Sequence, residues 1–250
     1  MANAQGTAYV RREDDALVVL DGAPWTNPRE TGERLAWQGA CFLVPCLPTK
    51  IVCVGLNYAL HVAESQTRST APEEPMLFFK PPSALIGAGE AIVLPAGAGR
   101  VDHEVEMALV VGTRLHRATV EEARHAIFGV TALNDVSARV YQKKDGQWGR
   151  AKGFDTFCPL GPGIARGVDP DQLALRARVN GVLRQDGHTR DLLVKSAELL
   201  SFVSGVMTLE PGDILSTGTP AGIGPLAPGD TVEIEVEGVG TLGNPVVAES

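Results

Sequence analysis

The feature that most limits the fold of this chain is a succession of short apolar runs separated by glycine and proline. The runs MLFF, AIVL, EMALVVG, AIFGVTAL and DILST all lie between turn-forming segments. Short apolar runs bounded in this way are typical of β-strands, whereas helices need longer periodic segments. The sequence therefore predicts a fold that is rich in strands and has few, short helices.

The clearest strand pattern is TVEIEVEGVG, in which apolar and acidic residues alternate. Successive side chains of a strand point to opposite faces. The alternation predicts three apolar residues facing the interior, Val232, Ile234 and Val236, and three acids facing solvent, Glu233, Glu235 and Glu237. The pair Asn180-Gly181 lies between two further strand-like segments and predicts a tight hairpin, because both residues tolerate positive φ.

Three segments are predicted to be helical. Thr119 and Glu122 have the spacing of a capping box at the start of TVEEARHAIF. KSAELLSFVSGVM repeats apolar residues at helical spacing. GERLAWQG is predicted to form a brief helix within a small N-terminal lobe, residues 1–47, which also contains the strand-like segments AYVRR and ALVVL. Residues 48–250 form the second predicted unit.

Composition excludes several classes of protein. The chain has 250 residues, 44% of them apolar, and a formal net charge of -8. It lacks the clustered Lys and Arg that a nucleic-acid partner requires and any apolar run long enough to span a membrane. Four cysteines without a CxxC pair argue against zinc and disulfides and favour buried, reduced thiols. We expect a soluble cytoplasmic protein that binds neither nucleic acid nor membrane.

The stretch NYALHVAES places His61 three residues before Glu64. In a helix this spacing puts both side chains on one face, where the carboxylate can orient the imidazole. Most such pairs are solvated neighbours, so the spacing by itself does not establish a catalytic pair.

Three carboxylates form a second candidate site. In VDHEVEMALVVG, Glu104 and Glu106 lie two residues apart, so both point to one face of a strand that then becomes wholly apolar. Asp135 in TALNDVSAR follows another apolar run, at an expected strand end. Carboxylates without His or Cys select a hard cation such as Mg²⁺, Mn²⁺ or Ca²⁺. A solvated strand face is the ordinary alternative explanation for the pattern E-x-E.

The motifs occur in an order that resembles the fumarylacetoacetate hydrolase family. They are Asn57-Tyr58 with His61 and Glu64, then DHEVEMALVVG, NDVSAR, AKGFDTFCPLGP, NGVLRQDG and GDILSTGTPAGIG. The resemblance covers residues 48–245 and is closest to the short members of the family, namely acylpyruvases, oxaloacetate decarboxylases and the isomerases of aromatic catabolism. It implies an α+β, mainly β fold, a mixed β-sheet roll with a few flanking helices. It also implies a homodimer and a Mg²⁺ or Mn²⁺ ion, with Ca²⁺ as a substitute, held by Glu104, Glu106 and Asp135.

The resemblance also implies roles for individual side chains. His61 would act as the base, with Glu64 orienting it, and Lys152 in AKGFDTF would hold a substrate carboxylate or a developing oxyanion. Further residues that the family places near the substrate are Arg139, Gln142, Arg184, Gln185 and Thr219.

These expectations define one leading function and two alternatives. The leading hypothesis is metal-dependent cleavage of a carbon-carbon bond in a small anionic 2-oxo acid, either hydrolysis of an acylpyruvate or fumarylpyruvate or decarboxylation of an oxaloacetate-type acid. The first alternative is an isomerase of 5-carboxymethyl-2-hydroxymuconate or 2-hydroxyhepta-2,4-diene-1,7-dioate type. The second is a non-catalytic protein that binds metal or ligand on the same fold. The presence of the His61–Glu64 pair favours cleavage, since family members that isomerise do not all keep it.

Overall fold

The centre of the fold is a seven-stranded mixed sheet. The computed structural model describes residues 2–3, 6–64 and 70–249 of the chain. The strand order is β7-β6-β17-β11-β12-β14-β8, and the pairs β6–β17 and β8–β14 are parallel. The strands are β6 (Ile51–Gly55), β7 (Met76–Lys80), β8 (Leu85–Ile86), β11 (Val105–Val111), β12 (Ile127–Asn134), β14 (Cys158–Ala165) and β17 (Ile214–Ser216).

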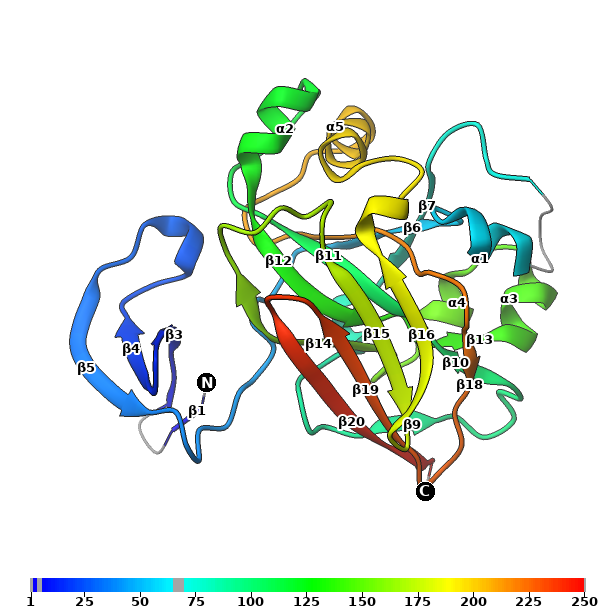
Figure 1. Ribbon diagram of the computed structural model, residues 1–250, viewed down its shortest axis with the longest axis horizontal. Helices are drawn as coiled ribbons and strands as arrows, with labels where there is room; N and C mark the ends of the chain where they lie inside the picture. The colour runs from blue at the N-terminus through cyan, green and yellow to red at the C-terminus, as the bar shows by residue number, and fades with distance from the viewer. Residues whose placement is uncertain (1, 4–5, 65–69, 250) are drawn as a thin grey trace.

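A five-stranded sheet packs against it, and the main apolar core contains residues of both sheets (Figure 1). Its order is β16-β15-β19-β20-β9, with β9 (Ile92–Leu94), β15 (Ala174–Val179), β16 (Val182–His188), β19 (Thr231–Val236) and β20 (Gly240–Ala248). The predicted alternation in β19 is confirmed, because its three apolar residues are fully buried. Asn180 and Gly181 have positive φ and join β15 to β16, which confirms the hairpin.

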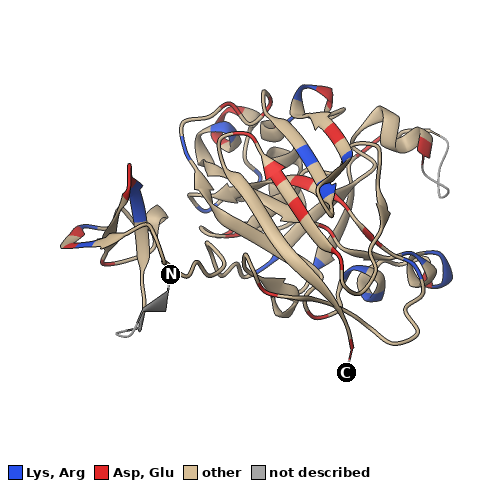
Figure 2. Cartoon of the chain, turned by 60° about the horizontal axis from the view of Figure 1, so that its bottom comes forward, with Lys and Arg blue, Asp and Glu red and all other residues tan. Residues whose placement is uncertain are grey.

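The outer face of this sheet carries paired charges of both signs. Glu235 is half-buried, and its carboxylate accepts a hydrogen bond of 2.8 Å from Arg178, so it is an ion-pair partner and not the freely solvated group expected from the sequence. Figure 2 shows Lys and Arg scattered among Asp and Glu over the part of the chain that the structure describes.

A third, three-stranded sheet and the helices complete the main unit. The sheet has the order β13-β10-β18, with β10 (Val101–His103), β13 (Ser137–Ala138) and β18 (Gly224–Pro225). The helices are α1 (Ala59–Glu64), α2 (Val120–Ala126), α3 (Arg139–Asp145), α4 (Gly149–Lys152) and α5 (Ser196–Val206), with 3₁₀ turns at Pro24–Thr26, Pro82–Ala84 and Thr189–Asp191. The capping box of Thr119 and Glu122 and the helix predicted in KSAELLSFVSGVM are both confirmed. Among the described residues, no helix is long and apolar enough to cross a membrane.

The N-terminal lobe is a small antiparallel sheet to one side of the main unit (Figure 1). It contains β3 (Tyr9–Glu13), β4 (Ala16–Leu20) and β5 (Glu30–Ala36), preceded by the two-residue strands β1 (Ala2–Asn3) and β2 (Gly6–Thr7). The helix predicted in GERLAWQG is wrong, because most of this segment belongs to β5. Gly32 has a φ of 86°, outside the helical region, and pairing with β4 satisfies the backbone. Trp25 packs edge-on against Phe128 of β12, with ring centroids 6.0 Å apart, and thereby attaches the lobe.

Candidate metal centre and active site

The three predicted carboxylates lie together in the interior. Each offers an oxygen within 4.8 Å of the others, and Glu104, Glu106 and Asp135 are 3%, 2% and 0% exposed. This burial rules out the alternative in which E-x-E marks a solvated strand face. Three buried acids so close together would repel one another unless positive charge lies nearby.

The backbone explains why Glu104 and Asp135 meet. Glu104 lies in the break between β10 and β11, where its N–H donates to the side-chain oxygen of Asn134 at 3.0 Å. Its carbonyl accepts from the N–H of Asp135, also at 3.0 Å. The side chain of Asn134 therefore replaces a regular strand contact and brings the two carboxylates to one side.

Two buried lysines and one arginine surround these acids. Lys152 donates to Glu104 at 2.9 Å and to Asp135 at 2.5 Å, and Lys80 donates to the other Asp135 oxygen at 2.6 Å. The Arg139 guanidinium forms an ion pair with the Glu104 carboxylate. Burial alone would raise the pKa of Glu104, but the Lys152 and Arg139 cations outweigh it and hold that pKa well below its usual range. The structure thus brings the predicted Lys152 and Arg139 to the carboxylates.

Glu106 differs from its neighbours because its hydrogen bonds come from uncharged groups. It accepts from the Ser216 hydroxyl and, at 3.1 Å, from the N–H of Gly218. Burial raises the pKa of Glu106 well above its ordinary value, and the charges of Asp135 and Glu104 raise it further. A divalent cation would supply the charge that this carboxylate lacks. The donor set, three carboxylates without His or Cys, fits a hard ion such as Mg²⁺ or Mn²⁺.

His61 is close enough to Glu104 for the charge of that carboxylate to act on it. The imidazole is 9% exposed, and its buried Nδ1 has no hydrogen-bond partner among the residues that the structure describes. Burial lowers the pKa of His61 and outweighs the opposite effect of Glu104. Glu64 instead accepts from the N–H of Gly222 at 2.9 Å. The helical spacing of the pair is confirmed, but Glu64 is bonded to the 219–223 loop, and Nδ1 of His61 has no partner in the described part of the chain.

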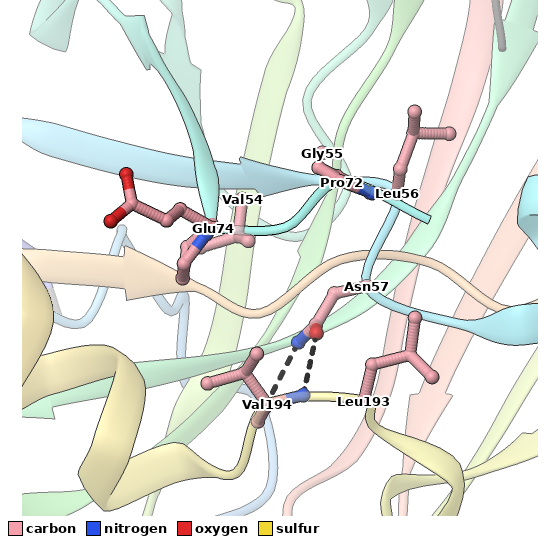
Figure 3. A pocket seen from close by; sticks show the side chains of 9 residues that line it. Val54, Gly55, Leu56, Asn57, Pro72, Glu74, Leu193 and Val194 are labelled. Carbon is pink, nitrogen blue, oxygen red and sulfur yellow. Dashed lines mark hydrogen bonds between the residues drawn. The ribbon is translucent and has the colours of Figure 1, made fainter. Parts of the chain in front are cut away.

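Asn57 fixes the start of the segment that carries His61. Its side-chain oxygen accepts from Val194 N–H at 2.9 Å, and its amide donates to the carbonyls of Val194 and Thr217 at 3.1 and 3.0 Å. Figure 3 shows the contact with Val194 and the small hollow beside it, between the end of β6 and the turn before α5. The hollow is lined by none of the three carboxylates.

The remaining predicted residues differ in position. Gln142 accepts from Arg139 at 2.9 Å and so belongs to the surroundings of the carboxylates. Arg184 is exposed on β16. Gln185 and Thr219 are buried and hydrogen-bonded to the backbone next to the ligands.

Sequence reasoning missed three residues that shape the centre: Lys80, Asp102 and Asn134. Asp102 is fully buried and accepts from Arg139 at 2.8 Å, and Lys80 has a fully buried ammonium. Lys80 follows an apolar strand and precedes two prolines, but that pattern does not reveal an interior ion pair. The partners become neighbours only when β7 and β12 enter the same sheet.

Comparison with known proteins establishes the family. Residues 50–247 match the family model described as fumarylacetoacetate (FAA) hydrolase C-terminal, and residues 2–45 match a model described as Rv2993c-like, N-terminal. The chain belongs to the fumarylacetoacetate hydrolase family, which confirms the resemblance of its motifs. The mixed, mainly β architecture is that of solved members.

Individual relatives carry different activities in their names. The oxaloacetate tautomerase YcgM of Escherichia coli is 42% identical over 81% of this chain and 94% of its own length. The structure of 5-carboxymethyl-2-hydroxymuconate delta-isomerase from Mycobacterium smegmatis has a TM-score of 0.92 and 45% identity, covering 99% of this chain and 98% of that one. Maleylpyruvate hydrolase from Sphingobium sp. SYK-6, solved with manganese(II) and pyruvate, has a TM-score of 0.79 and 30% identity, covering 96% of each chain.

Proposed function

We propose that this protein is a Mg²⁺- or Mn²⁺-dependent enzyme that moves a proton at the carbon next to the keto group of a small 2-oxo acid, as a tautomerase or isomerase does. The observation that carries the proposal is the buried His61 imidazole, whose Nδ1 has no hydrogen-bond partner among the described residues and on which the charge of Glu104 acts. Glu104 is one of three carboxylates suited to a hard cation. The similarity to tautomerases and isomerases favours this reaction over the cleavage that the presence of the His61–Glu64 pair favoured.

The chain's own side chains account for binding and proton transfer. A divalent cation held by the three carboxylates would supply a Lewis acid for the keto oxygen. Lys152 and Arg139 are cations that can hold the carboxylates of an anionic substrate. His61, kept neutral by its lowered pKa, can take the proton that leaves carbon and return it to the substrate.

Cleavage of a carbon-carbon bond is the second candidate. The relative that is a maleylpyruvate hydrolase, bound to pyruvate, favours it. In that reaction His61 would take a proton from water, and the water would attack the distal carbonyl. Glu64, whose charge already acts on His61, would orient the imidazole.

The test uses metal-stripped protein with and without Mg²⁺ or Mn²⁺. The substrates are enol oxaloacetate, a hydroxymuconate-type dienedioate, acetylpyruvate and fumarylpyruvate, and products are separated by chromatography. We expect metal-dependent conversion of the enol or the dienedioate without loss of carbon. Metal-dependent release of pyruvate from the acylpyruvates would instead establish cleavage.

Two variants assign the residues. His61→Ala should abolish turnover and leave Mn²⁺ binding intact, whereas His125→Ala, which removes an exposed imidazole on α2, should change neither. If His61→Ala retains full turnover, His61 is not the group that transfers the proton. Mn²⁺ binding without turnover on any 2-oxo acid would favour the non-catalytic alternative. The homodimer implied by the family stays a prediction, which sedimentation can test.

A further inference from the structure

Val105 lies between two of the three metal-ligand candidates and has an unusual neighbour on one side. Just before β11, the backbone groups of Glu104 bond to Asn134 and Asp135 at the end of β12. Those of Val105, the first residue of β11, therefore face the opposite side, toward β17. Direct backbone bonds on that side end at Met107, whose carbonyl accepts from Thr217 N–H. At Val105 no strand continues the ladder among the described residues.

Two side chains take the place of the missing strand. The side-chain oxygen of Gln185 accepts from Val105 N–H at 3.0 Å, and the Thr219 hydroxyl donates to the Val105 carbonyl at 2.8 Å. The Gln185 amide donates to the Thr219 hydroxyl at 2.8 Å, which closes a ring of three hydrogen bonds around this peptide segment. Both backbone groups of Val105 are thereby satisfied without a neighbouring strand.

This ring leaves no donor free for a substrate. Gln185 is fully buried, and its oxygen also accepts from His103 at 3.1 Å while its amide also donates to the Pro220 carbonyl at 2.8 Å. A carboxamide has two donors and two lone pairs, so its capacity is complete. The single proton of the Thr219 hydroxyl is already donated to Val105.

The geometry points to Gln185 and Thr219 as positioning residues that hold the metal-ligand strand, and not as contacts to substrate. By replacing the missing strand they fix the backbone at Val105, and with it the directions in which the flanking Glu104 and Glu106 carboxylates point. Tying the β16 hairpin arm and the 219–223 loop to this strand sets the spacing of the metal ligands. The inference depends on the metal site of the proposed function.

The test measures Mn²⁺ affinity without turnover, from the free-Mn²⁺ signal in electron paramagnetic resonance. Gln185→Met keeps the length of the side chain and removes all four hydrogen bonds, and Thr219→Val keeps the shape and removes the hydroxyl. We expect Mn²⁺ binding to weaken by about 10- to 100-fold, the usual effect of losing a group that orients a metal ligand. Thr219→Ser retains the hydroxyl and should restore most of the affinity.

A matched control separates positioning from general loss of stability. Asn244 is a buried amide on β20 that donates to the carbonyls of Gly87 and Glu90 at 2.8 Å, remote from β11 in the sheet order. Asn244→Leu should lower stability and leave Mn²⁺ affinity within about twofold of wild type. If it weakens binding as much as Gln185→Met does, the positioning role is refuted.

The remaining outcomes are also decisive. Wild-type Mn²⁺ affinity in Gln185→Met and Thr219→Val, with only KM raised, would show that these residues contact the substrate. If Gln185→Met does not fold, the comparison of Thr219→Val with Thr219→Ser decides the question. Failure of the wild-type protein to bind Mn²⁺, or binding that Glu106→Gln does not weaken, would overturn the proposed function together with this inference.

Discussion

Replacing Lys80 by Met should destabilise the metal-free protein more than any change to a surface ion pair. Met keeps an unbranched side chain of similar length and removes only the ammonium. Lys80 and Asp135 are both fully buried and 2.6 Å apart, and the same ammonium donates to the Val136 carbonyl at 3.1 Å. Removing one partner of a buried ion pair costs about 3–5 kcal/mol, because the other charge is left without compensation.

Lys152 would still pair with Asp135 in the variant. We therefore expect the decrease in the free energy of unfolding to lie near the lower end of that range. For a chain of this size, each kcal/mol lowers the midpoint of thermal unfolding by about 2–4 °C, so we expect a decrease of about 6–12 °C. Urea unfolding and calorimetry of metal-stripped protein measure both quantities. Arg178→Met, which removes a half-exposed pair with Glu235, should cost at most about 1 kcal/mol. Equal stability of Lys80→Met and wild type would refute the reasoning.

Three further predictions concern thiols, pH and a close backbone contact. Cys41 is exposed, whereas burial raises the pKa of the other three cysteines. Cys41 should therefore be the only thiol that Ellman's reagent modifies in the native protein. Modification of a second thiol in the native protein would contradict the burial of the other three. Burial lowers the pKa of His61 in the folded protein, so the unfolded chain binds a proton at this residue more readily than the folded protein does. The free energy of unfolding therefore has its full value above the ordinary pKa of 6.5 and decreases as pH falls through the lowered pKa. Urea unfolding at pH 7.5 and 5.5 should therefore show that the free energy of unfolding decreases more in wild type than in His61→Gln when the pH is lowered. An equal decrease in the two proteins would contradict the effect of burial on His61. In Gly222→Ala the new Cβ would lie 2.3 Å from the Arg184 carbonyl oxygen, at a φ of +98°. Calorimetry should show that the free energy of unfolding decreases by about 1–3 kcal/mol. Gly163→Ala, whose Cβ would meet open space, should leave the free energy of unfolding nearly unchanged.

Local patterns were sufficient for several features of the fold. The alternation in β19, the hairpin at Asn180 and the capping box at Thr119 each depend on residues a few positions apart, so the sequence contains their full cause. The GERLAWQG segment was misjudged because β5 forms only by pairing with β4. A short segment without strong caps takes the structure that its partner offers.

The candidate site also has features that the sequence predicts and features that only the tertiary structure shows. Glu104 and Glu106 share a face because side chains alternate along a strand, which the sequence determines. The sequence could not show that Lys80 neutralises Asp135, because 55 residues separate them. Nor could it show that the side chains of Gln185 and Thr219 bond to Val105 and to each other, or that Gln185 also bonds to His103 and Pro220.

The sequence by itself determined the family, the strand-rich architecture and the set of acids and bases around the centre, since these follow from ordered motifs and short-range periodicity. Only the tertiary structure decided which charges pair, which polar groups remain free and where Glu64 points. Pairing in a buried site depends on which strands become neighbours and how far each side chain reaches. Neither quantity is encoded within any single segment of the chain.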